Sequence, residues 1–145
     1  MSDDLSENTD VKIICSALRV DLICLYKDAG WWESSYDADS SFLDKIVKDS
    51  AVFAGAFIDQ QLIGMGRVLS DMTSDAFIQD VVVLKKYRGR GIGKKIIQLL
   101  IARLKKNNVD WIGLVAQPGT ASFYQELGFE VLKDHVPMKF KNSVL

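Results

Sequence analysis

Hydrophobic residues recur along this chain with two different periods, one typical of helices and one of strands. Helical spacing predicts helices at residues 18–29, from Ser41 onward, from Ile92 to the Asn107–Asn108 pair, and at 121–127. Runs of apolar and β-branched residues predict strands at 11–16, 51–58, 62–70, 76–83 and 111–115, and a final strand pair at 130–133 and 136–140. This order of elements predicts an α+β fold with a mixed sheet.

Local signals set the expected ends and faces of the helices. Gly30 is expected to end the first helix, whose inward positions are Leu18, Leu22, Leu25 and Tyr26. Ser41-x-x-Asp44 resembles a capping box, which would open the second helix. Thr120 is the expected N-cap of the last helix, which stops at Gly128. The long helix is expected to bury one face, formed by Ile92, Ile96, Ile97, Leu100, Ile101 and Leu104.

Composition narrows the class of protein. With 145 residues, 48% of them hydrophobic, the chain is expected to form one compact soluble domain over residues 1–145, with residues 1–10 as a flexible acidic leader. No apolar run approaches the roughly 20 residues of a membrane span, and no signal sequence is visible, so a cytoplasmic location is expected. A net charge of −1 argues against nucleic acid as a partner. Cys15 and Cys24 are expected to be free buried thiols, and neither they nor His135 indicates a metal site.

Between the strand at 76–83 and the long helix lies a turn with glycine at every second position, Gly89, Gly91 and Gly93. A strand that ends in such a turn and restarts as a helix presents unpaired backbone N–H groups at the positive end of a helix dipole. Glycine also permits the positive φ angles that let successive N–H groups converge on an anion. The turn therefore predicts a binding site for a phosphorylated ligand. It fits neither the P-loop motif nor the dinucleotide-binding motif, because Lys95 and Lys94 stand where those motifs need other residues.

The residues that do fit are Arg88-x-x-Gly91-x-Gly93, which resemble the acetyl-coenzyme A motif [QR]-x-x-G-x-[GA] of the GCN5-related N-acetyltransferase (GNAT) family. A basic turn that binds no ligand is the alternative for this motif taken alone. A second string, Phe123-Tyr124-Gln125-Glu126-Leu127-Gly128-Phe129, resembles the family's later motif F-Y-x-x-x-G-F in both order and spacing. The resemblance extends over residues 51–129 and implies a mostly antiparallel sheet, flanked by helices and splayed at the acetyl-CoA site.

The resemblance also implies the residues that handle acetyl-CoA, the expected co-substrate. The turn would hold the pyrophosphate, and the preceding strand would pair with the pantetheine arm and direct a backbone N–H at the acetyl oxygen. The cofactor-binding residues implied are Val81, Val82, Val83, Arg88, Gly89, Arg90, Gly91, Ile92, Gly93 and Lys94. Tyr124 matches the family tyrosine that donates a proton to the coenzyme A sulfur, and is otherwise an ordinary helix tyrosine.

The general base is less well defined. Some relatives carry Ile-Glu-Asp-Val-Val-Val where this chain has Ile78-Gln79-Asp80-Val81-Val82-Val83, so the glutamate is replaced by Gln79. Asp80 remains as a candidate catalytic base or acceptor anchor, or else as a buried aspartate that fixes the strand. Adjacent strand residues point to opposite faces, so Asp80 is not expected to occupy the glutamate's location. Deprotonation through a chain of waters is the default expectation.

For the acceptor, the resemblance points to the segment between the first two helices. Aromatic Trp31 and Trp32 beside Glu33, with Gln79 from the strand, would suit a primary amine, most simply a small molecule; solvated acids beside a tryptophan pair are the alternative. A sugar phosphate, for which Arg67 is the one obvious basic residue away from the turn, and a protein N-terminus stay open as acceptors. The predicted function is therefore acetyl transfer from acetyl-CoA to an amine, with no metal and with homodimer formation as an option. The alternative is a non-catalytic acyl-CoA sensor or interaction module of the same fold.

Overall fold

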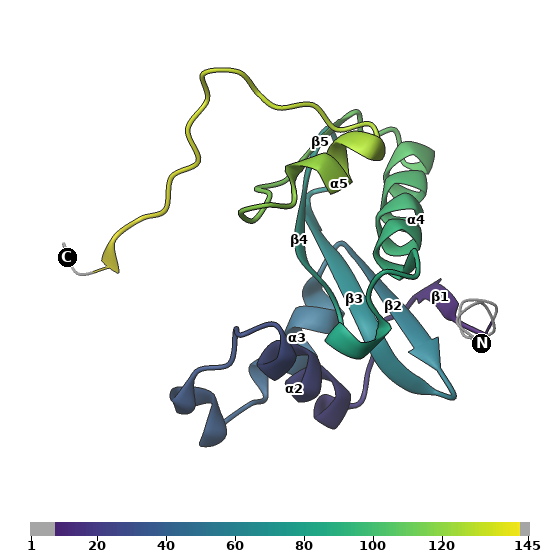
Figure 1. The fold of residues 1–145 in the computed structure, drawn as a ribbon. Coiled ribbons are helices and arrows are strands. Elements are labelled where there is room, and N and C mark those ends of the chain that lie inside the picture. The colour runs from purple at the N-terminus through teal and green to yellow at the C-terminus, as the bar shows by residue number, and fades with distance from the viewer. Residues whose placement is uncertain (1–7, 143–145) are drawn as a thin grey trace. The chain divides into compact units, whose positions relative to one another are not determined.

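The computed structural model describes residues 8–142, and its elements are shown in Figure 1. The chain divides into two structural units, Met1–Leu114 and Val115–Leu145. The first unit contains five strands, β1 (Asp10–Ile13), β2 (Val52–Ile58), β3 (Gln61–Ser70), β4 (Asp75–Val83) and β5 (Trp111–Gly113). Its helices are α2 (Arg19–Asp28), α3 (Phe42–Asp49) and α4 (Ile92–Lys106), with short 3₁₀ turns η1 (Ser34–Asp37) and η2 (Lys85–Tyr87). The second unit contains α5 (Ala121–Glu126).

The sheet has the strand order β1-β2-β3-β4-β5, so each strand lies beside its neighbour in the sequence. The first four strands pair antiparallel, and β5 pairs parallel with β4 after the crossover through α4. A parallel pair needs such a crossover because its two strands start at the same edge of the sheet. The predicted α+β fold, with a mixed and mostly antiparallel sheet flanked by helices, is confirmed.

Helix α4 packs against one face of the sheet, where β3 carries two glycines. A Cβ atom placed on Gly66 would lie 2.8 Å from Cγ2 of Ile96 and 3.2 Å from Cδ1 of Leu100. The missing side chains therefore let α4 approach the sheet closely. The buried face of α4 is the predicted one except for Ile101, which is only half-buried.

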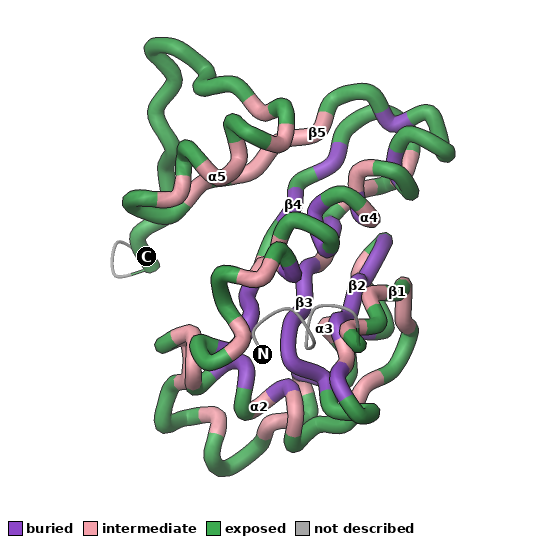
Figure 2. Tube along the Cα trace, turned by 45° about the vertical axis from the view of Figure 1, so that its right-hand side comes forward, coloured by how far each residue is buried: buried purple, intermediate pink, exposed green. Residues whose placement is uncertain are grey.

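Helices α2 and α3 bury the other set of apolar residues, and α2 packs against β3. Leu22, Leu25 and Tyr26 of α2 and Leu43 and Val47 of α3 are all buried. With the inner residues of β2, β3, β4 and α4 they form the core of the first unit (Figure 2).

Two predicted helix caps are wrong in their chemistry, although the helices begin where expected. Ser41 has a helical backbone and its side chain makes no capping hydrogen bond, while the Asp44 carboxylate pairs with Arg19. The guanidinium is a stronger partner for Asp44 than a backbone amide. Thr120 is the N-cap residue of α5, as predicted, but its side chain makes no capping bond, because its hydroxyl donates to the carbonyl oxygen of Gln117 at 2.7 Å.

Three predicted burials are also wrong. Cys15 and Cys24 are free thiols, as predicted, but both are exposed. Leu18 is 65% exposed, because it precedes the first turn of α2 and takes no part in the helix's inner face. Helical spacing alone does not say which apolar residues near a helix end will find a partner.

The final strand pair predicted at 130–133 and 136–140 does not form in the structure, which describes both segments. Met138 is 92% exposed and Val136 75% exposed. Alternating apolar residues form a strand only where another strand supplies hydrogen bonds, and none pairs with these segments. Of the predicted acidic leader, residues 1–7 lie outside the described residues, whereas Asp10 is the first residue of β1 and pairs with Phe57.

Within residues 8–142, no helix is both long and apolar enough to cross a membrane.

Candidate acetyl-CoA and acceptor site

The turn between β4 and α4 presents a row of unused backbone donors. None of the backbone N–H groups of residues 89–94 donates to another group of the described chain. The neighbouring amides are used: Arg88 N–H donates to the carbonyl of Lys85, and Lys95 N–H to that of Gly91. Consecutive free N–H groups at a helix start form a site for an anion, because they combine hydrogen-bond donors with the positive end of the helix dipole.

Two glycines give this turn its conformation. Gly89 has φ +76° and Gly91, the N-cap of α4, has φ +78°, both in the left-handed region that disfavours residues with a side chain. A Cβ at either position would meet no atom within 4 Å, so the space above the turn is open. The geometry fits the close approach of a phosphate group to the backbone.

The two arginines of the turn have different surroundings. Arg88 donates from Nε to the carbonyl of Val83 at 2.8 Å and so ties the turn to the end of β4. Arg90 stacks near Tyr87, with Cζ 5.7 Å from the ring centroid, and its Nη1 is buried without a hydrogen-bond partner in residues 8–142. A buried unpaired guanidinium nitrogen is costly unless a ligand satisfies it. Arg90 therefore supports anion binding here, whereas Arg88 also has a structural role.

One edge of β4 is open beside the turn. Strand β5 pairs only with the first residues of β4, from Asp75 to Phe77. The rest of β4, residues 78–83, is paired with β3 on one side and with no strand of the described chain on the other. Backbone groups on such an edge can pair with an extended ligand as with another strand. Val81, Val82 and Val83, the predicted pantetheine-binding residues, lie on this edge.

Asp80 sits at an irregularity in β4. Arg67 pairs with Gln79 and Met65 with Val82, so β4 has one more residue than β3 between these pairs. This is a β-bulge, and Asp80 in it has φ +53°. A bulge breaks the alternation of side chains, so the expectation that Asp80 and Gln79 point to opposite faces does not hold. The Asp80 carboxylate instead meets Arg67, whose cross-strand partner is Gln79.

Asp80 belongs to a small polar network that the sequence did not predict. Arg67 Nε donates to Asp80 Oδ2 at 2.6 Å, and the hydroxyl of Tyr26 donates to the same oxygen at 3.4 Å. Arg67 Nη1 also lies 3.4 Å from Oγ of Ser50, next to α3. Burial, and then the negative charge of Asp80, raise the pKa of Tyr26. A tyrosine hydroxyl is protonated at neutral pH even at its ordinary pKa, and the raised pKa of Tyr26 extends that state into alkali, so its hydroxyl acts as a donor.

The predicted acceptor segment forms an aromatic cluster that reaches this network. Tyr26 contacts Trp31 edge-on, with ring centroids 5.6 Å apart, and Phe42 at 6.2 Å. Tyr36 contacts Phe42 at 4.6 Å and Trp32 at 5.4 Å. Trp31 is thus linked to Asp80 by Tyr26, and Trp32 is linked to Tyr26 by way of Tyr36 and Phe42.

Trp32 already has polar partners of its own. Its Nε1 donates to Oδ1 of Asp37 at 3.0 Å, and Nζ of Lys27 lies 5.4 Å from its ring centroid. A cation of the chain therefore already lies over one face of this ring, where an acceptor cation could otherwise bind. Trp31, which contacts Tyr26, is the better placed of the two tryptophans. Glu33 and Gln79 are exposed.

Tyr124 lies in the second unit, on α5. Its ring contacts Phe123 at 5.0 Å and Phe129 at 5.8 Å, both edge-on. Burial raises the pKa of its hydroxyl, which makes no hydrogen bond with the described residues. Tyr124 is thus a protonated, unpaired donor at neutral pH. Phe129 follows Gly128, whose φ of +100° turns the chain back so that the Phe129 N–H donates to the carbonyl of Tyr124.

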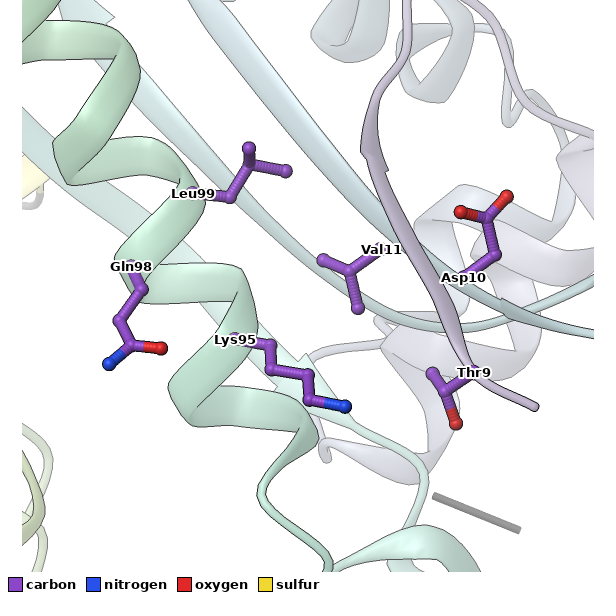
Figure 3. Close-up of a pocket in the computed structure, with 6 residues that line it drawn as sticks. All are labelled: Thr9, Asp10, Val11, Lys95, Gln98 and Leu99. Atoms are coloured by element: carbon purple, nitrogen blue, oxygen red, sulfur yellow. The ribbon is translucent and has the colours of Figure 1, made fainter. Parts of the chain in front are cut away.

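A shallow hollow between β1 and α4 contains none of the predicted site residues (Figure 3). Its lining residues are Thr9, Asp10, Val11, Lys95, Gln98 and Leu99. The sequence marked Arg67 only as a basic residue that a sugar phosphate could use, and it gave no indication that Tyr26 or Arg67 binds Asp80, because the bulge and the packing of α2 bring both to it. The one signal in the sequence was Asp80 itself, because aspartate is uncommon within a run of residues that favour strands.

Comparison with known proteins identifies the family. The sequence model of the acetyltransferase (GNAT) family matches residues 17–129. The chain therefore belongs to the GNAT acetyltransferase family, which uses acetyl-CoA as co-substrate. The structure is similar to that of a GNAT family acetyltransferase from Streptococcus pneumoniae, with a TM-score of 0.78 and 25% identity over 92% of this chain and 98% of that one.

Curated relatives are similar over part of the chain. A GCN5-related N-acetyltransferase 2, chloroplastic, from Arabidopsis thaliana is 40% identical over 72 residues, which is 50% of this chain and 28% of the relative. An uncharacterized N-acetyltransferase ycf52 from Gracilaria tenuistipitata var. liui is 35% identical over 98 residues, or 65% of this chain and 54% of the relative. This chain thus spans about half or less of the length of these relatives.

Proposed function

We propose that this acetyltransferase moves the acetyl group of acetyl-CoA to the primary amine of a small molecule. The observation that carries the proposal is the row of free backbone N–H groups at residues 89–94, which lies at the start of α4 beside an open edge of β4. A pyrophosphate is negatively charged and has oxygens that accept hydrogen bonds, so it complements these N–H donors at the positive end of the helix dipole. When bound, acetyl-CoA supplies an activated acetyl thioester.

Backbone N–H groups and one arginine would bind acetyl-CoA. The backbone amides from Gly89 to Lys94 would hold the pyrophosphate, with Gly89 and Gly91 giving the turn its shape. The unpaired Nη1 of Arg90 would donate a hydrogen bond to the same group. The open edge of β4 at Val81, Val82 and Val83 would align the pantetheine arm. A backbone N–H on this edge would then stabilise the negative charge that develops on the acetyl oxygen.

Two proton transfers complete the chemistry. The amine must lose a proton before it attacks, because an alkyl ammonium has a pKa of about 10.4. Water, or Asp80 where the acceptor reaches it, would take that proton. Tyr124, whose hydroxyl is protonated at neutral pH, would give a proton to the departing thiolate.

The polar network supports an amine rather than a phosphorylated sugar as acceptor. Arg67 is the basic residue on β3 that a sugar phosphate could use, and it is already bound to Asp80. Trp31 and Tyr26 would instead contact the apolar body of an amine, with Glu33 and Gln79 at the exposed side. A serotonin N-acetyltransferase 2 from Oryza sativa is 32% identical over 74 residues, which is in keeping with an amine acceptor.

A thiol-release assay tests the proposal directly. Acetyl-CoA would be the donor, and the acceptor panel would contain aryl amines, alkyl amines, an amino-sugar phosphate and a peptide with a free N-terminus. We expect thiol release with the small amines and little with the sugar phosphate. Tight acetyl-CoA binding without thiol release from any amine would instead support a non-catalytic acyl-CoA sensor. Cytoplasmic location and homodimer formation stay predictions.

A further inference from the structure

We propose that Tyr26 and Arg67 are positioning residues that hold one carboxylate oxygen of Asp80, so that its other oxygen receives the ammonium group of an acceptor with an aromatic body. This inference rests on the proposed function and names the atom that recognises the amine. It begins from an asymmetry in how Asp80 is bound.

Both partners of Asp80 use the same oxygen. Arg67 Nε lies 2.6 Å from Oδ2 and the Tyr26 hydroxyl 3.4 Å from Oδ2. Oδ1 accepts no hydrogen bond from the described residues. A carboxylate has about four lone-pair sites, so the second oxygen is available to a donor from outside the chain. The Asp80 side chain is 23% exposed and can therefore be reached.

The backbone and the two partners together fix the direction of Oδ1. Asp80 lies in the β-bulge with φ +53°, a conformation that the surrounding sheet must hold in place. Arg67 is itself held by β3 and by its contact with Ser50. A carboxylate clamped at one oxygen cannot rotate freely, so its other oxygen points in a constant direction. This is the preorganisation that recognition of a single ammonium group requires.

The charge balance suits an acceptor that must later lose its proton. Arg67 offsets part of the charge of Asp80, and an ammonium at Oδ1 still forms a charge-assisted hydrogen bond that a neutral ligand does not form. The nearby guanidinium also disfavours a second positive charge, which assists release of the amine proton.

Tyr26 links this polar anchor to an apolar surface. Its hydroxyl touches Asp80, while its ring contacts Trp31 and Phe42. An acceptor whose ammonium lies at Oδ1 would therefore place its body near aromatic rings. An amine with an aromatic body matches this arrangement of one charge acceptor and adjoining rings.

The test compares variants with a matched control. Tyr26→Phe removes the hydroxyl on Asp80 and keeps the ring, whereas Tyr36→Phe removes a hydroxyl of the same aromatic cluster that has no hydrogen bond in the described chain. Arg67→Lys keeps the charge and loses the guanidinium geometry. Steady-state kinetics with 2-phenylethylamine would give KM for the amine and for acetyl-CoA. Inhibition by 2-phenylethanol, a neutral analogue, would give its Ki.

We expect Tyr26→Phe and Arg67→Lys to raise KM for the amine roughly 3- to 10-fold, the effect of losing one hydrogen bond. KM for acetyl-CoA and Ki for the alcohol should stay within about twofold of wild type, because neither ligand uses Oδ1 as an ion partner. Tyr36→Phe should change none of the three constants. Asp80→Asn should remove most of the preference for the amine over the alcohol.

Equal rises in KM for the amine and Ki for the alcohol would overturn the inference, since a merely structural role affects both ligands. An unchanged amine KM in Tyr26→Phe and Asp80→Asn would overturn it too. If Arg67→Lys does not fold, Tyr26→Phe decides, because it keeps the packing of the ring. Failure of the proposed function is distinct: wild-type protein would then release no thiol with any amine.

Discussion

At the scale of single residues, backbone angles decide which groups face a ligand. Gly91 at φ +78° opens the start of α4, and Asp80 at φ +53° turns a carboxylate toward α2. The glycine adopts this angle without strain, whereas aspartate does so at a cost that neighbouring contacts must offset. The pairing with Arg67 and the bond from Tyr26 are those contacts.

Tyr124→Phe tests the proposed proton donor. The change removes only the hydroxyl, so we expect kcat to fall by roughly 10²–10⁴ while both KM values stay nearly unchanged. Steady-state kinetics over pH 6–9 would measure this. Tyr87→Phe, a tyrosine outside the proposed proton path, is the control. A Tyr124→Phe variant with the wild-type rate at every pH would show that Tyr124 only packs against Phe123 and Phe129.

The raised pKa of Tyr26 predicts that the folded protein loses stability at alkaline pH. Burial and the charge of Asp80 raise its pKa above the ordinary value of 10.0. An unfolded tyrosine loses its proton near pH 10, while the folded Tyr26 keeps it. The contribution of Tyr26 to the free energy of unfolding is therefore constant below pH 10 and falls above it. The slope from this residue is at most about 1.4 kcal/mol per pH unit.

Urea unfolding at pH 8 and pH 11 measures that loss. We expect Tyr26→Phe to lose less stability than wild type between the two pH values, although its stability at pH 8 is lower. Equal losses in both proteins would contradict a role for Tyr26 in the alkaline response.

At the scale of elements, the site depends on where β4 ends and α4 begins. The N–H groups of residues 89–94 are free because the first turn of a helix has no earlier carbonyl to bind. Arg88 holds the turn to the carbonyl of Val83. Close packing of Ile96 and Leu100 on Gly66 fixes α4 against the sheet, and this packing keeps the start of the helix beside the open edge of β4.

Gly91→Ala tests the turn. Its Cβ would project into the open space where the pyrophosphate is proposed to lie, so we expect at least a tenfold loss of acetyl-CoA affinity by calorimetry. Left-handed alanine also costs roughly 1–2 kcal/mol of stability. Gly30→Ala is the matched control, because Gly30 has φ +79° and an equally open Cβ position at the end of α2.

Gly30→Ala should show a similar loss of stability and an unchanged affinity for acetyl-CoA. If the two variants bind acetyl-CoA equally well, the turn is not the pyrophosphate site.

At the scale of the whole molecule, membership of the GNAT acetyltransferase family agrees with the sheet of the first unit. The parallel pair of β4 and β5 is short, from Asp75 to Phe77 on β4, and the rest of that edge is left without a strand. A β5 that paired along the whole of β4 would leave no free backbone groups on β4 for a ligand. The architecture of the sheet therefore leaves open the edge at which acetyl-CoA is proposed to bind.

Acetyl-CoA should stabilise the folded protein against heat. A ligand at 100 times its Kd adds about 2.7 kcal/mol when it binds only the folded state. For a chain of this size that raises Tm by roughly 5 to 10 °C. Scanning calorimetry measures the shift, and adenosine at the same concentration is the control because it lacks a pyrophosphate. Equal shifts with both ligands would argue against recognition of the pyrophosphate.

The sequence by itself determined the order of elements up to α5 and the position of the glycine-rich turn between β4 and α4. Both depend on local signals: the period of apolar residues along a helix or strand, and glycines at positions 89, 91 and 93. Such signals act within a few residues and are therefore visible in the sequence. The two family motifs added the identity of the donor.

Tertiary structure alone decided what surrounds Asp80. The bulge in β4 and the packing of α2 bring Arg67 and Tyr26 to its carboxylate, from residues 13 and 54 positions away. The same dependence on distant partners explains why Ser41 and Asp44 do not form a capping box and why residues 136–140 form no strand. A hydrogen bond or a strand forms only when both partners meet, and local sequence patterns do not show which distant residues will meet.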